Sequence, residues 1–413
     1  MEQVRSVFLN SLKHGLRGTQ LSSREELSAE QWEKLAELAG EHKVTPLMFD
    51  AVRTQPQLQD TEVLSRLRQQ SRQQIVVQTR KSYDFLRVYE SLRQAGITPL
   101  VVKGIICRNL YPQPDLRPSS DEDLLILPEQ VSKCHEILCQ NGLRTAATPE
   151  QMETDYEIPY RSAVSPLFLE LHKHLFPPES GAYGDMNRFF DGVFGRAIRE
   201  EIQGVSVYTL SHTDHLLYLI CHAFKHFLHS GFGIRQVCDI VLYANTYGAQ
   251  IDWDYVLNSC RQFHGEQFAA AIFRIGSKHL VFDAEKAAYP PAWQEIAVNE
   301  MPMLEDLLSG GVYGGASMSR KHSSNITLDA VTAQKRGKKK GHGVLAVVFP
   351  SAAKLEGRYP YLKKHPYLLP VAWCSRIWTY GKETRNTKNN RAADAVKIGS
   401  ERIELLKEYG ILR

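Results

Sequence analysis

A change of period near residue 96 limits the folds open to this chain more than any other feature. Residues 61–95 carry apolar side chains at helical spacing, and Gly96 follows as a natural helix end. Ile97–Val102 is then a short apolar run rich in β-branched residues, and Asp121–Leu127 is a second apolar run. Two buried strands after a long amphipathic helix predict a mixed sheet with helices packed around it.

The rest of the chain extends this division. Ser165–Leu171 has the pattern of a third strand, and helical spacing returns from about residue 213. We therefore expect an α+β fold, with a small mixed-sheet core between extensive helical regions. The predicted parts are a helical N-terminal region (1–95), an α/β core (96–210) and a helical C-terminal region (211–413). The last region contains a basic, glycine-rich loop (334–343).

Composition excludes several classes of protein. Of the 413 residues, 43% are hydrophobic and 23% are charged, which excludes collagen-like and wholly disordered chains. Lys and Arg number 50 against 46 Asp and Glu, and a net charge of only +4 does not predict a nucleic-acid partner. No apolar stretch of about 18 residues occurs, so no membrane span is expected. Seven cysteines without a CxxC pair indicate reduced thiols and a cytoplasmic location.

Carboxylates mark the second and third predicted strands. Asp121 and Asp123 are two residues apart, and alternate side chains of a strand share a face. Like charges so placed repel unless a cation lies between them, and oxygen ligands favour Mg²⁺ or Mn²⁺. Glu170 adds a third carboxylate if its strand is a neighbour. The pattern fits metal-assisted phosphoryl or nucleotidyl transfer, and the aspartate pair alone also fits the end of a surface strand.

Cationic residues precede the acidic pair. Lys103 and Gly104 follow the first predicted strand, where a glycine lets backbone N–H groups approach a phosphate and the lysine adds a positive charge. Arg117 lies just before Asp121, at a position from which it could bind phosphate oxygens or orient the carboxylates.

The run VVKGIICRNLYPQPDLRPSSDEDLLI (Val101–Ile126) resembles the signature of an uncharacterised nucleotidyltransferase family within the DNA polymerase β-like superfamily. LELH (Leu169–His172), the segment His222–Ile240 and PYLLPVAWCSR (Pro366–Arg376) resemble later motifs of that family. The resemblance extends over about residues 20–385, and the first run is its most specific part. It implies a polymerase β-like core.

The resemblance also implies an activity: a Mg²⁺-dependent nucleotidyltransferase, with Mn²⁺ as the alternative metal. Such an enzyme would move NMP from an NTP, with ATP expected, to a hydroxyl or phosphate acceptor on a small molecule, sugar or protein, and release pyrophosphate. Transfer to a protein hydroxyl would be AMPylation. By this match Asp121, Asp123 and Glu170 are catalytic and hold the metal, and Glu170 draws the proton from the attacking hydroxyl. The positions matched to the nucleotide are Lys103, Gly104, Arg117 and Ser120.

Two positions depart from the superfamily pattern. Lys103 and Gly104 replace the usual Gly-Ser turn, and Glu122 stands between the aspartates where an apolar residue is usual. A buried charge is costly, so we expect either an open strand end or a Glu122 side chain that reaches the metal. A non-catalytic module that binds nucleotide or a partner on the same fold is the alternative function.

Histidines gather in the second half of the chain. His222 and His226 are one helical turn apart and His229 follows, a spacing that fits either a structural helix or a zinc-dependent hydrolase. Arg235 and Asp239 are also four residues apart and have the spacing of an ion pair with each other. The candidate substrate contacts are His172, His222, Lys225, His226, Arg235 and Asp239.

Overall fold

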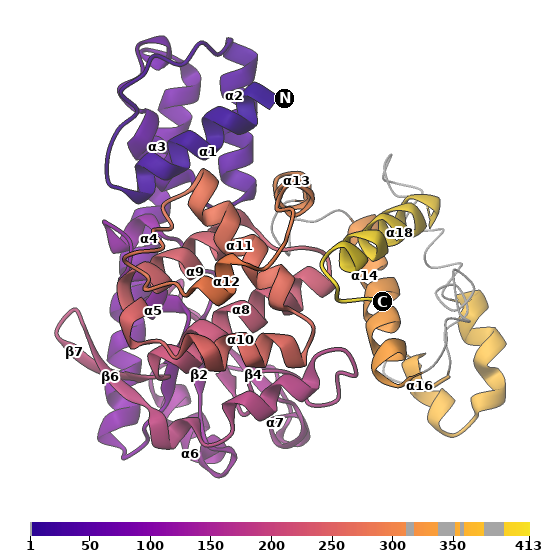
Figure 1. Ribbon diagram of the computed structural model, residues 1–413. Helices are drawn as coiled ribbons and strands as arrows, with labels where there is room; N and C mark the ends of the chain where they lie inside the picture. Colours follow the sequence, from indigo (N-terminus) through magenta and orange to yellow (C-terminus); the bar gives the residue numbers. More distant parts are fainter. Residues whose placement is uncertain (1, 311–317, 338–351, 356–358, 376–391) are drawn as a thin grey trace. The chain divides into compact units, whose positions relative to one another are not determined.

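The computed structural model shows the chain as two compact units (Figure 1). The described residues are 2–310, 318–337, 352–355, 359–375 and 392–413. The first unit consists of Met1–Phe224 and Phe232–Val312, and the second of Lys225–Gly231 and Tyr313–Arg413. The boundaries predicted after residues 95 and 210 stay predictions.

Seven strands form one mixed sheet in the first unit. They are β1 (Leu100–Val102), β2 (Glu122–Leu125), β3 (Leu143–Arg144), β4 (Glu157–Ser162), β5 (Phe168–His172), β6 (Ile198–Ile202) and β7 (Val205–Thr209). Their order across the sheet is β3-β4-β5-β2-β1-β7-β6. The central strand β2 pairs antiparallel with β1 and parallel with β5, and β1 pairs parallel with β7. The ends of β1, β2 and β5 therefore meet near the middle of the sheet.

The predicted fold class is confirmed, because a mixed sheet is combined with many helices. β1, β2 and β5 are the three strands expected from the sequence. The β6–β7 hairpin was missed. Its two-residue turn, Gln203–Gly204, has positive φ at both positions, 51° and 81°, as a type I′ turn requires. The usual Asn-Gly or Asp-Gly signal is absent because glutamine occupies the first position.

Thirteen α-helices begin in the described part of the first unit. They are α1 (Glu2–Leu16), α2 (Ala29–Glu41), α3 (Thr45–Val52), α4 (Glu62–Gln94), α5 (Gly104–Arg108), α6 (Val131–Gln140), α7 (Pro149–Thr154), α8 (His212–Leu228), α9 (Ile234–Tyr247), α10 (Trp253–Gln262), α11 (Glu266–His279), α12 (Pro291–Gln294) and α13 (Met301–Gly310). The long helix α4 packs against α2 and α3 and also against α6 and β7, so it joins the N-terminal helices to the sheet (Figure 1).

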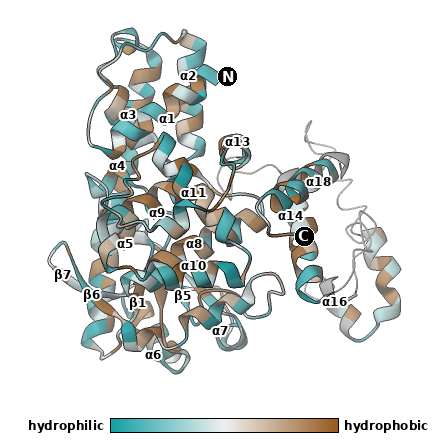
Figure 2. Cartoon of the chain, in the orientation of Figure 1, coloured by the Kyte–Doolittle hydropathy of each residue, from teal (hydrophilic) through white to brown (hydrophobic). Residues whose placement is uncertain are grey.

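The core of the first unit is apolar and includes α8. Leu216, Leu217, Ile220 and Phe224 of this helix are all buried, and Figure 2 shows apolar residues along the strands and the neighbouring helices. Burying such a side chain stabilises the fold by roughly 1.5–3 kcal/mol. Within the described ranges, no helix has both the length and the apolar character needed to cross a membrane.

The second unit is helical where it is described. Its helices are α14 (Met318–Lys335), α16 (Ala352–Leu355) and α18 (Ala392–Glu408), and α14 packs along α18. Gln334 Nε2 donates to the Ile411 carbonyl at 2.8 Å, which ties the chain end to α14. The predicted basic loop at 334–343 begins in the last turn of α14, and residues 338–343 lie outside the described residues.

Glu122, the charged residue between the two aspartates, is fully buried. Its Oε1 forms an ion pair with Arg108 and accepts a hydrogen bond from Ser119 Oγ at 2.9 Å. Its Oε2 accepts the Ile105 N–H at 2.8 Å. Both expectations for Glu122 were therefore wrong: the strand end is closed, and the side chain is neutralised by Arg108 on α5. Glu122 fixes α5 against β2.

Gly104, at the start of α5, lies against this carboxylate. It has a φ of 34°, and a Cβ added here would lie 2.1 Å from Glu122 Oε2. Gly96, at the end of α4, has a φ of 77° but no atom within 4 Å of an added Cβ. A substitution at Gly96 therefore adds backbone strain alone, whereas a substitution at Gly104 adds both backbone strain and steric overlap.

We predict that Gly104→Ala lowers the free energy of unfolding by about 3 kcal/mol, because strain and overlap with Glu122 add. Gly96→Ala should lower it by only about 1 kcal/mol, because it adds backbone strain alone. Urea unfolding of both variants measures the difference. Equal losses would show that Glu122 is free to move away from Gly104.

Candidate active site

Strand register brings the central carboxylates together. Asp123 on β2 is the direct partner of Glu170 on β5 and of Val102 on β1. Directly paired residues share a face of the sheet, and His172 lies on the same face as Glu170 because it is two residues further along β5. Asp123, Glu170 and His172 thus form one group, in which their ligand atoms lie within 4.8 Å of one another.

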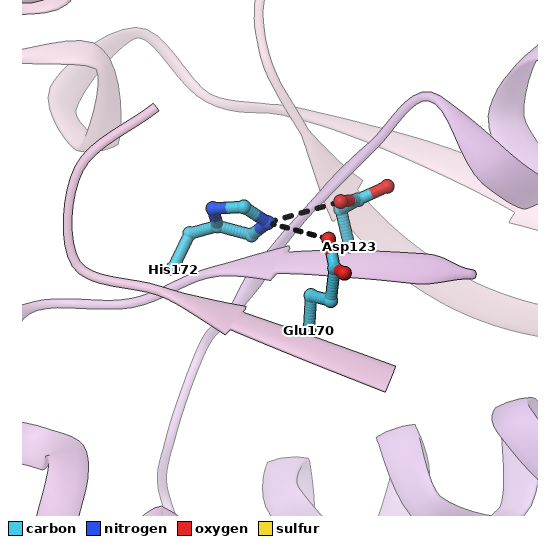
Figure 3. Close-up of side chains that lie close together, drawn as sticks. All are labelled: Asp123, Glu170 and His172. Carbon is cyan, nitrogen blue, oxygen red and sulfur yellow. Dashed lines mark hydrogen bonds and ion pairs between the residues drawn. The ribbon is translucent and has the colours of Figure 1, made fainter. Parts of the chain in front are cut away.

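One ring nitrogen of His172 faces both carboxylates (Figure 3). Its Nε2 is 3.0 Å from Asp123 Oδ1 and 3.7 Å from Glu170 Oε2. Its Nδ1 is 3.7 Å from Oε2 of Glu157, on β4. His172 was predicted from the sequence as a substrate contact, and the geometry adds it to the candidate metal ligands.

Lys103 occupies the other side of Asp123. Its Nζ is 2.9 Å from Asp123 Oδ2 and 3.3 Å from Nε2 of His222 on α8. Two residues predicted for different roles, Lys103 for the nucleotide and His222 for the substrate, are thereby placed in contact with each other.

Charge pairing sets the protonation of this group. Burial alone would raise the pKa of Asp123, but Lys103 and His172 outweigh it and hold that pKa below its ordinary value. Burial would lower the pKa of His172, but its hydrogen bond to Asp123 and its ion pair with Glu170 raise it to about 9. Burial raises the pKa of Glu170 and the charge of Asp123 raises it further, whereas the nearby His172 acts to lower it. At neutral pH Asp123 is a carboxylate held between two cations.

The backbone of Lys103 is held in a strained conformation. Its φ of 56° and ψ of −124° lie in a region that favours glycine. The Lys103 N–H donates to Nε2 of His215 at 3.3 Å, so the His215 proton is on Nδ1, 3.1 Å from Thr209 Oγ1. Thr209 in turn donates to the Val101 carbonyl at 2.6 Å. Burial lowers the pKa of His215 to about 3, which keeps this ring neutral and able to accept.

Asp121 lies one residue before β2 and outside the three-residue group. It is nevertheless within electrostatic reach, because its charge contributes to raising the pKa of both Glu170 and Lys103. Its predicted role as a metal ligand stays a prediction.

Arg117 forms a buried ion pair with Asp239 of α9. Its Nε and Nη2 each donate to a separate carboxylate oxygen of Asp239 at 2.7 Å, and Tyr111 also donates to Asp239 Oδ1 at 2.7 Å. The spacing that suggested an Arg235–Asp239 pair therefore missed the partner that Asp239 has in the fold. The charge of Arg117 is thus already compensated by Asp239. The predicted contact of Arg117 with the triphosphate stays a prediction.

The remaining predicted residues are dispersed. Ser120 is exposed, and its hydroxyl accepts a hydrogen bond from Lys43 Nζ at 3.3 Å. Arg235 donates to the Pro118 carbonyl. Lys225 and His226 follow His222 on α8 but belong to the second unit.

A zinc site on α8 is not supported. In the residues that the structure describes, the only group of three or more His, Cys, Asp or Glu that could hold a metal ion is Asp123, Glu170 and His172. The α8 histidines are not part of it.

We predict that the apoprotein loses stability as pH rises through the titration of His172. The ordinary pKa is about 6.5 and the folded pKa is about 9, so between these values the folded state binds more protons than the unfolded state, and the free energy of unfolding falls with pH. From pH 6.5 to 8 the loss should be about 2 kcal/mol. Denaturant unfolding with a chelator present measures it. His172→Gln should remove the loss, whereas the exposed His174→Gln should retain it; an unchanged slope in His172→Gln would contradict the assignment.

We also predict that Arg117 and Asp239 are coupled in stability. Arg117→Met leaves a buried carboxylate without its partner and should cost about 3–5 kcal/mol. The double variant Arg117→Met/Asp239→Leu should recover most of this cost, because neither charge is then left unpaired. Chemical unfolding of the two single variants and the double variant tests the coupling, and additive losses would argue against a structural pair.

Comparison with known proteins agrees with the geometry. Residues 28–280 match a family described as uncharacterised nucleotidyltransferase, and these residues include the whole sheet, the acidic group and α8 to α11. No solved structure and no functionally curated protein shows significant similarity to the chain. Because the matched region is more than half of the chain, the protein belongs to this nucleotidyltransferase family.

Proposed function

We propose that the protein is a divalent-metal-dependent nucleotidyltransferase that moves NMP from an NTP to a hydroxyl or phosphate acceptor and releases pyrophosphate. The observation that carries the proposal is the direct pairing of Asp123 with Glu170 across β2 and β5, in a chain that belongs to a nucleotidyltransferase family. ATP is the expected donor, and the acceptor is a small molecule, a sugar or a protein.

The donor atoms suit a divalent cation. Asp123 and Glu170 supply carboxylate oxygens, and His172 would supply an imidazole nitrogen once the metal displaces its proton. Carboxylate ligands favour Mg²⁺, and a site that also has an imidazole ligand is compatible with Mn²⁺ as the alternative metal. Asp121 is the further carboxylate proposed for this site. When bound, the metal would neutralise charge on the triphosphate and polarise the acceptor oxygen.

Glu170 is placed to take the proton of the acceptor. It is the more exposed of the two carboxylates, with 21% of its side chain accessible against 1% for Asp123. Its raised pKa makes it a better base than an ordinary glutamate. The acceptor oxygen would bond to the α-phosphorus while the bond to the β-phosphate oxygen breaks. The proton would pass to Glu170, and pyrophosphate would leave.

A non-catalytic module that binds nucleotide or a partner is the second candidate. It is favoured by the occupancy of Asp123, because Lys103 and His172 already lie against both of its oxygens. Glu122 no longer bears on this choice, since it is neutralised by Arg108 on the other face of β2. Pyrophosphate release separates the two candidates.

We predict that Asp123→Asn reduces pyrophosphate release with ATP and Mg²⁺ or Mn²⁺ by at least about a hundredfold, because the charge that binds the metal is lost. Glu170→Gln should have a similar effect and serves if Asp123→Asn folds poorly. Asp254→Asn, an exposed carboxylate on α10, is the matched control and should retain activity.

Thermal unfolding with each NTP, with and without metal, supplies the second readout. A ligand present at 100 times its dissociation constant stabilises the native state by about 2.7 kcal/mol. The proposal expects a metal-dependent stabilisation that Asp123→Asn abolishes. Nucleotide binding without pyrophosphate release for any acceptor class would instead establish the non-catalytic module, and Asp121→Asn shows whether Asp121 contributes to metal binding.

A further inference from the structure

We propose that Lys43, Lys81 and Arg235 form a binding site for the polyphosphate chain of the nucleotide, supplied largely by the N-terminal helices. This inference rests on the proposed function, which it deepens by naming the groups that hold the phosphates. Lys43 and Lys81 belong to no motif identified in the sequence, and Arg235 was predicted only as a substrate contact.

The three cations converge on one short loop from three different places in the fold. Lys43, between α2 and α3, donates to Ser120 Oγ at 3.3 Å. Lys81 on α4 donates to the Ser119 carbonyl at 2.7 Å, and Arg235 on α9 donates to the Pro118 carbonyl. Consecutive residues 118–120 thus each accept a hydrogen bond from a different cation. This loop leads directly into Asp121 and the active-site strand β2.

These cations have no carboxylate partner of their own. Among the described residues, none of the three forms an ion pair within 4.0 Å, whereas Lys103 is paired with Asp123 and Arg117 with Asp239. The two cations that the sequence assigned to the triphosphate are therefore already neutralised inside the fold. The uncompensated positive charge lies instead on Lys43, Lys81 and Arg235.

Electrostatics place the cluster beside the active site. The charge of Asp121 acts to raise the pKa of Lys43, Lys81 and Arg235, so this carboxylate lies within reach of all three. Burial is the main cause that lowers the pKa of Lys81, to about 8, and the charge of Arg235 contributes to lowering it and that of Lys43. The charge of Glu122 also acts on Lys81, and that of Asp239 on Arg235, but these two carboxylates are already paired with Arg108 and Arg117. Three cations beside Asp121 therefore leave a surplus of positive charge, which an anion would relieve.

The cluster also has a surplus of hydrogen-bond donors. An ammonium group has three donors and a guanidinium has five, but within the described part of the chain each of these side chains makes one hydrogen bond, and that bond is to the loop. Gln78, one turn before Lys81, accepts the Ser119 N–H at 2.8 Å, and its buried amide nitrogen has no acceptor in the described structure. A polyphosphate chain offers many acceptor oxygens and several negative charges. A polyphosphate chain therefore matches both the surplus of positive charge and the surplus of hydrogen-bond donors. The carboxylates beside this cluster are those proposed for the transfer site.

Binding of inorganic tripolyphosphate to the full-length protein, measured by titration calorimetry without divalent metal, tests the proposal. Lys43→Gln and Arg235→Gln should each weaken tripolyphosphate binding at least about tenfold. Lys34→Gln is the matched control. Lys34 also belongs to the N-terminal helices, but its ammonium is already paired with Glu30 at 2.6 Å. Lys43 is the primary variant because its partly exposed side chain contributes little to the core, and circular dichroism confirms that each variant is folded.

The same site must also serve the nucleotide. Tripolyphosphate should compete with ATP, and Lys43→Gln should weaken ATP binding more than AMP binding, because AMP lacks the β- and γ-phosphates. Equal tripolyphosphate affinity in Lys43→Gln, Arg235→Gln and Lys34→Gln would overturn the proposal. Simultaneous binding of tripolyphosphate and ATP would also overturn it, since the cations would then hold a phosphate of another ligand.

The Asp123→Asn variant separates this proposal from the proposed activity. It should still bind tripolyphosphate without metal, because the cation cluster is intact. If pyrophosphate is never released but Lys43→Gln loses tripolyphosphate, the transfer activity fails and the anion site stands. If transfer depends on Asp123 while Lys43→Gln binds tripolyphosphate and ATP normally, the activity stands and the anion site fails.

Discussion

Two buried charge pairs on the short strand β2 support both the fold and the site. Glu122 and Asp123 are adjacent, fully buried and directed to opposite faces of the sheet. Each carboxylate would be very costly without a cation, so Arg108 neutralises the first and Lys103 with His172 neutralises the second. The first pair anchors α5, and the second sets the geometry of the acidic group. The turn between β1 and α5 lies between the two pairs: its Lys103 contacts Asp123, and its Gly104 lies against Glu122. These two contacts hold the backbone of the turn in its strained conformation.

Much of this arrangement could be predicted from short-range patterns. The helical period of residues 61–95 and the stop at Gly96 correspond to α4. The apolar runs gave β1, β2 and β5, and the resemblance gave the family. Even the approach of Glu170 to Asp123 followed from assuming that their strands are neighbours.

The rest depends on contacts between residues distant in sequence. Arg117 and Asp239 are 122 positions apart, and Lys43 and Ser120 are 77 apart, so no local period relates them. Arg235 and Asp239 had the better spacing for an ion pair, but the tertiary fold gave Asp239 a bidentate partner instead. The Glu122–Arg108 pair is closer in sequence, yet its signal was ambiguous: a charged residue in an apolar strand shows that a partner is needed without showing which one.

The electrostatics of Asp123 place a condition on activity. Its two oxygens face Lys103 at 2.9 Å and His172 at 3.0 Å, so a divalent cation would have to compete with these two positive groups for Asp123. The proposed polyphosphate site would provide a way to meet this condition. Lys103 is the nearest cation to Asp123, and negative charge brought to the neighbouring loop by phosphates would draw its ammonium away from the carboxylate. Nucleotide binding and exposure of the metal ligands would then be coupled, and a nucleotide-free site would keep Asp123 neutralised.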